Sequence, residues 1–137
     1  MTTSEHFFDT NVVLYALSED TEFFEPSLRL LRSGGTISVQ VLNECAHTLR
    51  RKFSTPWPRI KTASEQLREM CAVEPLTAET HVRGLAFAER YQLNVYDGMI
   101  VAAAVIAGCK TLYSEDMRDG LIIEGLTIRN PYTAAGG

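Results

Sequence analysis

Hydrophobic residues in this chain alternate between short β-rich runs and longer stretches in which they recur with helical spacing. The β-rich runs predict strands at residues 6–8, 36–39, 111–113 and 126–128, with a weaker strand or extended link at 73–76. Because Pro75 has no backbone N–H, the weaker strand can pair only at the edge of a sheet.

The intervals between these strands carry helical patterns. The first predicted helix follows Asp9-Thr10-Asn11, the second begins near Pro26 and the third spans about 42–53. The fourth follows Thr55-Pro56 and carries its apolar positions from Ile60 to Met70. The last two span about 78–91 and 98–107, and Asp97 opens the final one. Strands that alternate with helices favour a three-layer α/β fold, in which helices flank a central parallel sheet. No repeat, low-complexity tract or linker divides the chain. We therefore expect one domain over residues 1–132 and a short flexible tail at 133–137.

Composition narrows the class of protein. The longest apolar run, 99–107, is far shorter than the ~20 residues that a membrane-spanning helix requires. Residues 1–6 also lack the basic and apolar regions of a signal peptide. We therefore expect a cytoplasmic protein without a membrane partner.

Cysteine and histidine usage restricts the possible metal chemistry. The three cysteines, Cys45, Cys71 and Cys109, are odd in number and widely spaced, which predicts reduced, buried thiols rather than a disulfide framework. The three histidines are equally scattered, so the chain carries no zinc motif. A bound metal would have to be held by oxygen ligands.

The charge distribution points in two directions. A formal net charge of -4 counts against a nucleic-acid-binding protein, because such proteins usually present a basic face to phosphates. Between residues 47 and 68, however, six basic residues accompany the single acid Glu65: Arg50, Arg51, Lys52, Arg59, Lys61 and Arg68. This stretch is either a contact surface for RNA or a solvated helical face, and composition alone favours the solvated face.

Four acidic residues are candidates for a common site. Asp9 and Asp116 follow predicted strands, and ligands of parallel sheets bind outside the carboxyl ends of the strands. Asp97 opens a nearby helix, and Glu44 lies on the apolar side of its helix, where it can point inward. Carboxylates packed together repel one another unless a cation intervenes, and hard, oxygen-seeking Mg²⁺ or Mn²⁺ fits best.

Each of these acids also has an ordinary structural explanation. Asp9 and Asp97 could be plain helix N-caps, Glu44 a surface helix residue and Asp116 a turn residue. Only their joint arrangement favours a metal site.

Several short motifs, in order along the chain, resemble those of one protein family. They are Phe8-Asp9-Thr10-Asn11, Asn43-Glu44, the segment 96–104 (YDGMIVAAA), Leu112-Tyr113-Ser114-Glu115-Asp116 and Asn130-Pro131-Tyr132. Together these motifs resemble PIN-domain proteins, in particular the VapC-type toxins of bacterial toxin-antitoxin pairs. The resemblance covers nearly the whole chain.

The resemblance implies a PIN-like fold and an endoribonuclease that depends on Mg²⁺ or Mn²⁺, forms homodimers and is inhibited by a small antitoxin. The residues at the family's acidic positions are Asp9, Glu44, Asp97 and Asp116. Asn11 and Ser114 stand at its supporting polar positions. Asp119 could replace or assist Asp116. As a hypothesis, Asp9 and Asp97 bind the principal ion directly, while Glu44 and Asp116 orient its waters or hold a second ion. Arg50, Arg51 and Lys52 are the candidates for contact with RNA.

Two other functions are open to the sequence. A strand-end aspartate also serves as the nucleophile of aspartyl-phosphate enzymes. Asn11, however, stands where such a phosphatase needs a second aspartate, and Lys110 precedes the strand that a receiver domain's lysine would follow. The second alternative is a non-catalytic PIN-like interaction module.

No motif places a histidine as a general base for a metal-free ribonuclease, so we expect chelation of metal to abolish cleavage.

Overall fold

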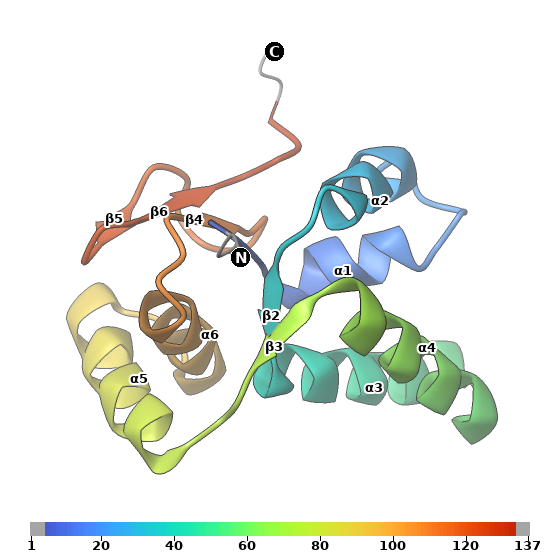
Figure 1. Cartoon of the computed structure of the whole chain (residues 1–137), viewed down its shortest axis with the longest axis horizontal. Helices are drawn as coiled ribbons and strands as arrows, with labels where there is room; N and C mark the ends of the chain where they lie inside the picture. The colour runs from blue at the N-terminus through green and yellow to red at the C-terminus, as the bar shows by residue number, and fades with distance from the viewer. Residues whose placement is uncertain (1–4, 134–137) are drawn as a thin grey trace.

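Strands and helices alternate over residues 5–133, the part of the chain that the computed structural model describes (Figure 1). The strands are β1 (His6–Phe8), β2 (Thr36–Ser38), β3 (Ala72–Glu74), β4 (Thr111–Tyr113), β5 (Ile122–Ile123) and β6 (Leu126–Arg129). The helices are α1 (Thr10–Ala16), α2 (Phe24–Arg32), α3 (Val39–Phe53), α4 (Trp57–Met70), α5 (Ala78–Tyr91) and α6 (Val95–Ile106). Beyond Thr133, the predicted tail lies outside the described residues.

The strands form one sheet in the order β3-β2-β1-β4-β6-β5. All neighbouring pairs are parallel except β5 with β6, so the predicted central parallel sheet is confirmed, with one antiparallel strand at its edge. The opposite edge strand is β3, as Pro75 indicated. The sequence analysis missed β5, which has only two residues and therefore shows no alternating pattern. A two-residue hairpin turn, Glu124-Gly125 with both φ angles positive, joins it to β6.

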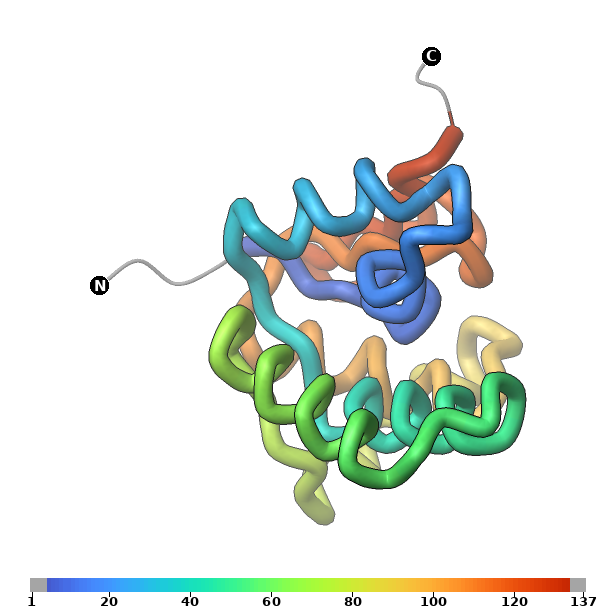
Figure 2. The backbone as a smooth tube through the Cα atoms, turned by 90° about the vertical axis from the view of Figure 1, so that its right-hand side faces the viewer, coloured from blue at the N-terminus to red at the C-terminus, as the bar shows by residue number. Residues whose placement is uncertain are grey.

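Helices cover both sides of this sheet. Figure 1 shows α1 and α2 on one side and α5 and α6 on the other. Helix α3 contacts both α1 and α6, and the tube view in Figure 2 shows α3 beside α4 below α1 and α2. The three-layer prediction is thereby confirmed. The central strands carry the core, and Phe7, Phe8 and Leu112 have no exposed surface.

Close packing of α5 against α6 fixes the start of α6. A Cβ atom added at Gly98 would lie 2.4 Å from the carbonyl oxygen of Gly84, and one at Gly84 would lie 2.8 Å from Met99 Sδ. Real Cβ contacts are not this short. Gly98 is needed because its Cβ would meet backbone, whereas at Gly84 the end of the flexible Met99 side chain could shift. The crossing lies next to Asp97, in the first turn of α6, and holds that turn in place.

Two predicted helix starts were wrong. Helix α3 begins at Val39 rather than residue 42, because the Ser38 side chain accepts a hydrogen bond from Val41 N and caps it. Helix α6 begins at Val95, and its N-cap is Asn94, whose Oδ1 accepts from Asp97 N at 2.8 Å. Asp97 is therefore not the N-cap. Asparagine is at least as good a cap as aspartate, and here it starts the helix three residues earlier.

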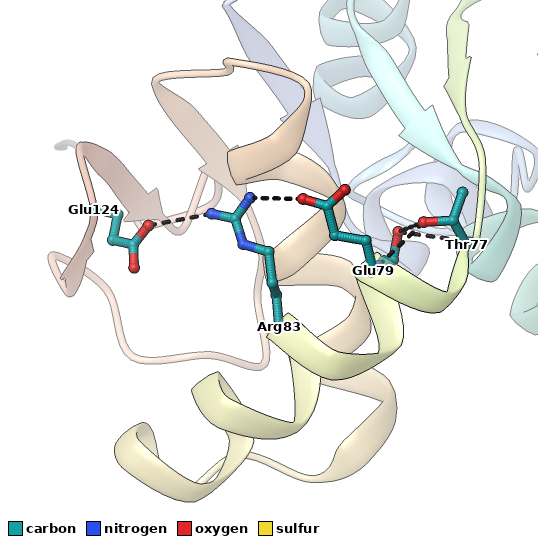
Figure 3. A network of polar contacts seen from close by, with 5 residues as sticks. Thr77, Glu79, Arg83 and Glu124 are labelled. Carbon is teal, nitrogen blue, oxygen red and sulfur yellow. Dashed lines mark hydrogen bonds and ion pairs between the residues drawn. The ribbon is translucent and has the colours of Figure 1, made fainter.

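A polar network joins α5 to the β5–β6 turn. Figure 3 shows Arg83 between Glu79, one turn earlier in α5, and Glu124 of the turn, with nitrogen–oxygen distances of 3.7 and 3.3 Å. Thr77, also labelled, caps α5 by accepting from Thr80 N. These ion pairs are partly exposed, so we expect them to stabilise the fold by less than about 1 kcal/mol each.

Two further sequence predictions concern the described residues. All three cysteines are buried and none forms a disulfide, as predicted. None of the helices described is long and apolar enough to cross a membrane.

Candidate active site

The strand order places the candidate site. Strand β1 lies between β2 and β4 in the sheet. The chain passes from β1 through α1 and α2 to β2, and it reaches β4 only after it has returned from β3. The carboxyl ends of β1 and β4 therefore border the point where the strand order reverses, and open α/β sheets bind ligands there. Asp9 directly follows β1, and Ser114 directly follows β4.

Asp9 is held by both of these strand ends. Its Oδ1 accepts a hydrogen bond from Thr10 N at 2.7 Å, which makes it the N-cap of α1, and its Oδ2 accepts from Ser114 Oγ at 2.7 Å. The side chain is only 2% exposed. Asp9 is thus both a helix cap and a buried carboxylate at the switch point, so its two explanations from the sequence are compatible.

Glu44 reaches the same place from α3. Its Oε1 accepts from Thr10 Oγ1 at 2.7 Å and its Oε2 from Gln40 Nε2 at 2.9 Å. The residue is half-buried, and it faces the N-terminus of α1 as its helical position indicated. Thr10 therefore contacts one acid through its backbone and another through its side chain.

Asp97 and Asp116 complete the group. Asn94 Nδ2 donates to Asp97 Oδ2 at 3.2 Å, and Asn11 Nδ2 donates to Asp116 Oδ2 at 2.6 Å. Within residues 5–133, no lysine or arginine forms an ion pair with any of the four acids. Neutral donors orient these carboxylates, and their negative charge stays uncompensated by basic side chains.

All four acids line one open cleft with a volume of about 1140 Å³. They come from the ends of β1 and β4, from α3 and from the first turn of α6. The wall also carries two exposed acids, Glu19 and Asp20, and its other polar residues include Thr10, Asn11, Gln40, His47, Lys52, Arg59 and Tyr96. The topology thus brings together four carboxylates that are widely separated in sequence.

The pKa shifts show that these acids form one electrostatic cluster. Burial, followed by the charges of Asp97 and Asp116, raises the pKa of Asp9 to about 7 against the opposing effect of its hydrogen bonds. Burial, with the charges of Glu44 and Asp116, raises the pKa of Asp97 to about 6. The pKa of Asp116 is also raised, first by burial and then by Glu115 and Glu44. Such clustered, perturbed carboxylates are typical of functional sites.

The donor set fits a hard divalent cation. Carboxylate, amide and hydroxyl oxygens surround the cleft, and these are the ligands that Mg²⁺ and Mn²⁺ prefer. Within residues 5–133, no three acidic, histidine or cysteine side chains lie close enough together to coordinate one ion jointly. Charge repulsion acts over longer distances than coordination, so the acids influence one another's pKa without touching a common point. Mg²⁺ usually takes only one or two protein carboxylates and keeps several waters, which suits this spacing.

The other predicted site residues divide into two groups. Asn11 and Ser114 contact acids as described, and Lys52 lines the cleft. Asp119 is not part of the cleft wall. Its Oδ1 accepts from Asn130 N at 2.9 Å and so holds the loop before β5 against the end of β6.

Arg50 and Arg51 lie outside the cleft wall. Arg50 donates to the carbonyl oxygen of Thr55 at 3.2 Å, and its guanidinium carbon lies 5.0 Å from the centre of the Trp57 ring. Arg51 is exposed on α3.

Several residues of the cleft were not predicted from the sequence. Thr10 and Gln40 orient Glu44, and His47 lines the wall. Arg59, which also lines the wall, belongs to the basic stretch that was a candidate for RNA contact. Gln40 and His47 lie four residues before and three residues after Glu44, so helical spacing places them on its face and could have identified them. No local signal indicated Thr10.

The fold and the site define an α/β domain with an acidic cluster at the topological switch point of its sheet. The chain belongs to the PIN domain family, whose family model matches residues 6–118 and so includes all four acids. Among curated proteins, no match to the chain was found.

Three solved structures have a similar fold. The toxin VapC20 of Mycobacterium tuberculosis, described as cleaving the Sarcin-Ricin loop, is 21% identical, with a TM-score of 0.68 over 81% of this chain and 89% of its own. A toxin-antitoxin complex from Klebsiella pneumoniae is 18% identical, with a TM-score of 0.71 over 93% and 98%. VapBC2 from Rickettsia felis, bound to a DNA fragment from its promoter, is 18% identical, with a TM-score of 0.66 over 91% and 97%.

Proposed function

We propose that this PIN-domain protein is an endoribonuclease dependent on Mg²⁺ or Mn²⁺ and the toxin of a toxin-antitoxin pair. The observation that carries the proposal is the convergence of four carboxylates without basic partners on one cleft. Buried negative charge of this kind destabilises a fold unless a cation or protons compensate it. The likeness to VapC20, a toxin described as cleaving the Sarcin-Ricin loop, supports RNA as the substrate.

In this proposal each acid has a role that follows from its position. Asp9 and Asp97, the acids with the larger shifts, hold the ion, and Glu44 and the exposed Asp116 orient water and the scissile phosphate. Such an ion, when bound, makes hydroxide available near neutral pH and neutralises charge that develops on the phosphate. Ser114 keeps Asp9 in its orientation through the 2.7 Å hydrogen bond.

The supporting side chains hold the four carboxylates in their orientations. Thr10, Gln40, Asn11 and Asn94 donate to the acids and have no charge of their own, so they orient the carboxylates without competing for the ion. A lysine or arginine in these places would neutralise the cluster and weaken metal binding.

We assign RNA contact first to Lys52 and Arg59, because both line the cleft that contains the acids. Arg50 and Arg51, on the last turn of α3, would meet more distant phosphates of a bound strand. Phosphate contacts of this kind supply affinity and salt dependence but no sequence specificity, so they leave the identity of the RNA open.

The partners and the organisation of the chain are also proposed. Residues 1–132 act as one domain, two copies form a homodimer in the cytoplasm, and a small antitoxin covers the cleft. The similarity to the Klebsiella structure, described as a toxin-antitoxin complex, supports such a partner. An antitoxin segment with a basic side chain would compensate the charge of the four acids.

The decisive experiment incubates the purified protein with total cellular RNA and Mg²⁺ or Mn²⁺. EDTA and Asp97→Asn are the negative controls, and Asp116→Asn is compared with Asp119→Asn. We expect defined fragments that disappear with EDTA, Asp97→Asn and Asp116→Asn and persist with Asp119→Asn, because Asp119 is bonded to Asn130 away from the cleft. Cleavage that survives EDTA but is lost with His47→Gln would replace metal catalysis with a histidine base.

Two other functions make different predictions. A non-catalytic module would neither cut RNA nor bind Mn²⁺ in a calorimetric titration. Aspartyl-phosphate chemistry would use Asp9 as the nucleophile, but Asn11 stands where a phosphatase of that kind needs its second aspartate. Trapping of Asp9 by a beryllofluoride analogue would favour that chemistry.

A further inference from the structure

A second cleft borders two of the four acids. Asp97 and Asp116 line the large cleft described above and also this smaller one, which has a volume of about 530 Å³. The rest of its wall comes from the end of α5, the link to α6 and the loop after β4, including Arg90, Asn94 and Arg118. The two acids therefore border both clefts, and the two clefts meet at Asp97 and Asp116.

The charges of the second cleft suit a phosphate chain. Besides the two shared acids, its wall carries two arginines, Arg90 and Arg118, which supply fixed positive charge. The guanidinium of Arg90 lies 5.5 Å from the ring centre of Tyr91 and is partly held by this contact. Arginine in such a constrained position is well suited to bidentate contact with phosphate.

The backbone of the second cleft is also ordered for this purpose. Ser114 Oγ accepts from Met117 N at 3.2 Å, and Arg118 O accepts from Leu121 N at 3.2 Å, so the loop that carries Arg118 is fixed at both ends. The 12-residue helix α6 begins at the same cleft, with Asn94 as its N-cap. The positive end of its dipole favours an anion beside the two arginines.

We propose that the bound RNA strand crosses Asp97 and Asp116, with one side of the scissile phosphate in the large cleft and the other in the second cleft, its phosphates paired with Arg90 and Arg118. This inference rests on the proposed function. It assigns an RNA contact to residues outside the basic stretch 50–68. A strand path that is open in both directions also accounts for cleavage within a chain rather than from its end.

The test measures RNA binding rather than cleavage. A fluorescein-labelled single-stranded RNA is titrated with full-length Asp9→Asn protein in Mg²⁺, and fluorescence anisotropy is followed over a range of salt concentrations. Into this parent we introduce Arg90→Gln with Arg118→Gln. The matched control is Arg29→Gln with Arg32→Gln, which removes two exposed positive charges on α2 that do not line either cleft.

We expect the double variant in the second cleft to bind about tenfold more weakly than its parent. Loss of two phosphate contacts should also reduce the slope of log K against log salt concentration by about 1.4. The corresponding pair of lysine substitutions should restore most of the slope, because it restores the charge. Circular dichroism melting curves check that all variants fold.

Two results are distinguishable failures. If the parent binds RNA, Lys52→Gln weakens it, and the second-cleft variant behaves like the α2 control, the proposed strand path is wrong while the proposed function stands. If neither the parent binds RNA nor the wild type cuts it, the proposed function is wrong and the strand path with it.

Discussion

Replacing Asp9 by asparagine tests whether the acidic cluster is built for a cation. Burial and neighbouring charge raise the pKa of Asp9 from 3.8 to about 7 in the folded state. Because the folded state binds this proton more tightly than the unfolded state, ionising Asp9 destabilises the fold as the pH rises from about 4 to 7. A rise of about 3 pKa units means that ionised Asp9 lowers the free energy of unfolding by roughly 4 kcal/mol above pH 7. Below pH 4 this loss of stability is absent.

Asparagine removes this cost while it keeps the hydrogen bonds. Its Oδ1 can accept from Thr10 N as Asp9 does, and its Nδ2 can donate to Ser114 Oγ, whose hydroxyl then turns to another acceptor. In EDTA we therefore expect Asp9→Asn to match the wild type at pH 4. At pH 8 it should be more stable by about 2 to 4 kcal/mol, and it should lack nuclease activity.

The assay is urea unfolding followed by circular dichroism at pH 4, 6 and 8, with and without Mn²⁺. Glu69→Gln, which removes an exposed carboxylate on α4 that lines neither cleft, is the control for the loss of one negative charge. Mn²⁺ should stabilise the wild type at pH 8 more than Asp9→Asn, since a ligand that binds only the folded state raises its stability. If Asp9→Asn is less stable than the wild type at pH 8 in EDTA, Asp9 is a structural cap and the reasoning fails.

Three other substitutions test the fold and the cleft. Gly98→Ala should destabilise the protein by about 1 to 3 kcal/mol in urea unfolding, because its Cβ would meet the backbone of Gly84 at 2.4 Å. A loss of stability below about 0.5 kcal/mol would mean that the two helices separate easily. Arg83→Gln should cost less than about 1 kcal/mol in the same assay, since its ion pairs are partly exposed, and a larger loss would show that the network in Figure 3 is a major contributor. Lys52→Gln should weaken binding of single-stranded RNA and lower its salt slope by about 0.7, whereas an unchanged slope would make the basic stretch a solvated face.

Much of the fold could be predicted because its signals are local. Strands β1 and β4, the edge position of β3 and the Thr77 cap of α5 follow from residues within a few positions of each element. Predictions failed where two local signals compete or where the element is very short. Asn94 and Asp97 are both good N-caps, and sequence alone does not show which of them starts α6. Strand β5 depends on pairing with β6, which no local pattern reveals.

The four acids could be named from motifs, but their arrangement could not be derived from them. Hydrogen bonds between distant segments set their orientation: Ser114 to Asp9 and Asn11 to Asp116 each span 105 positions of sequence. The same limit explains why the basic residues were assigned unevenly. A charge run gives no facing direction, so it did not separate Lys52, which lines the cleft, from Arg50, which packs on Trp57.

The strand order explains why a cleft forms between these acids at all. From β1 the chain first moves through β2 to β3 in one direction and then returns to place β4 on the other side of β1. The connections after β1 and β4 therefore diverge, which leaves a crevice outside the carboxyl ends of these two strands. Asp9 follows one of these strands and Ser114 the other. Two hydrogen bonds join the strand ends across the switch point, one from Asp9 N to the carbonyl oxygen of Tyr113 and one from Ser114 Oγ to Asp9 Oδ2. The first turn of α6 and the middle of α3 then supply Asp97 and Glu44 from the two sides. A sequence with the same acids but a different strand order would separate Asp9 from Asp116, and its carboxylates would be ordinary caps and turn residues.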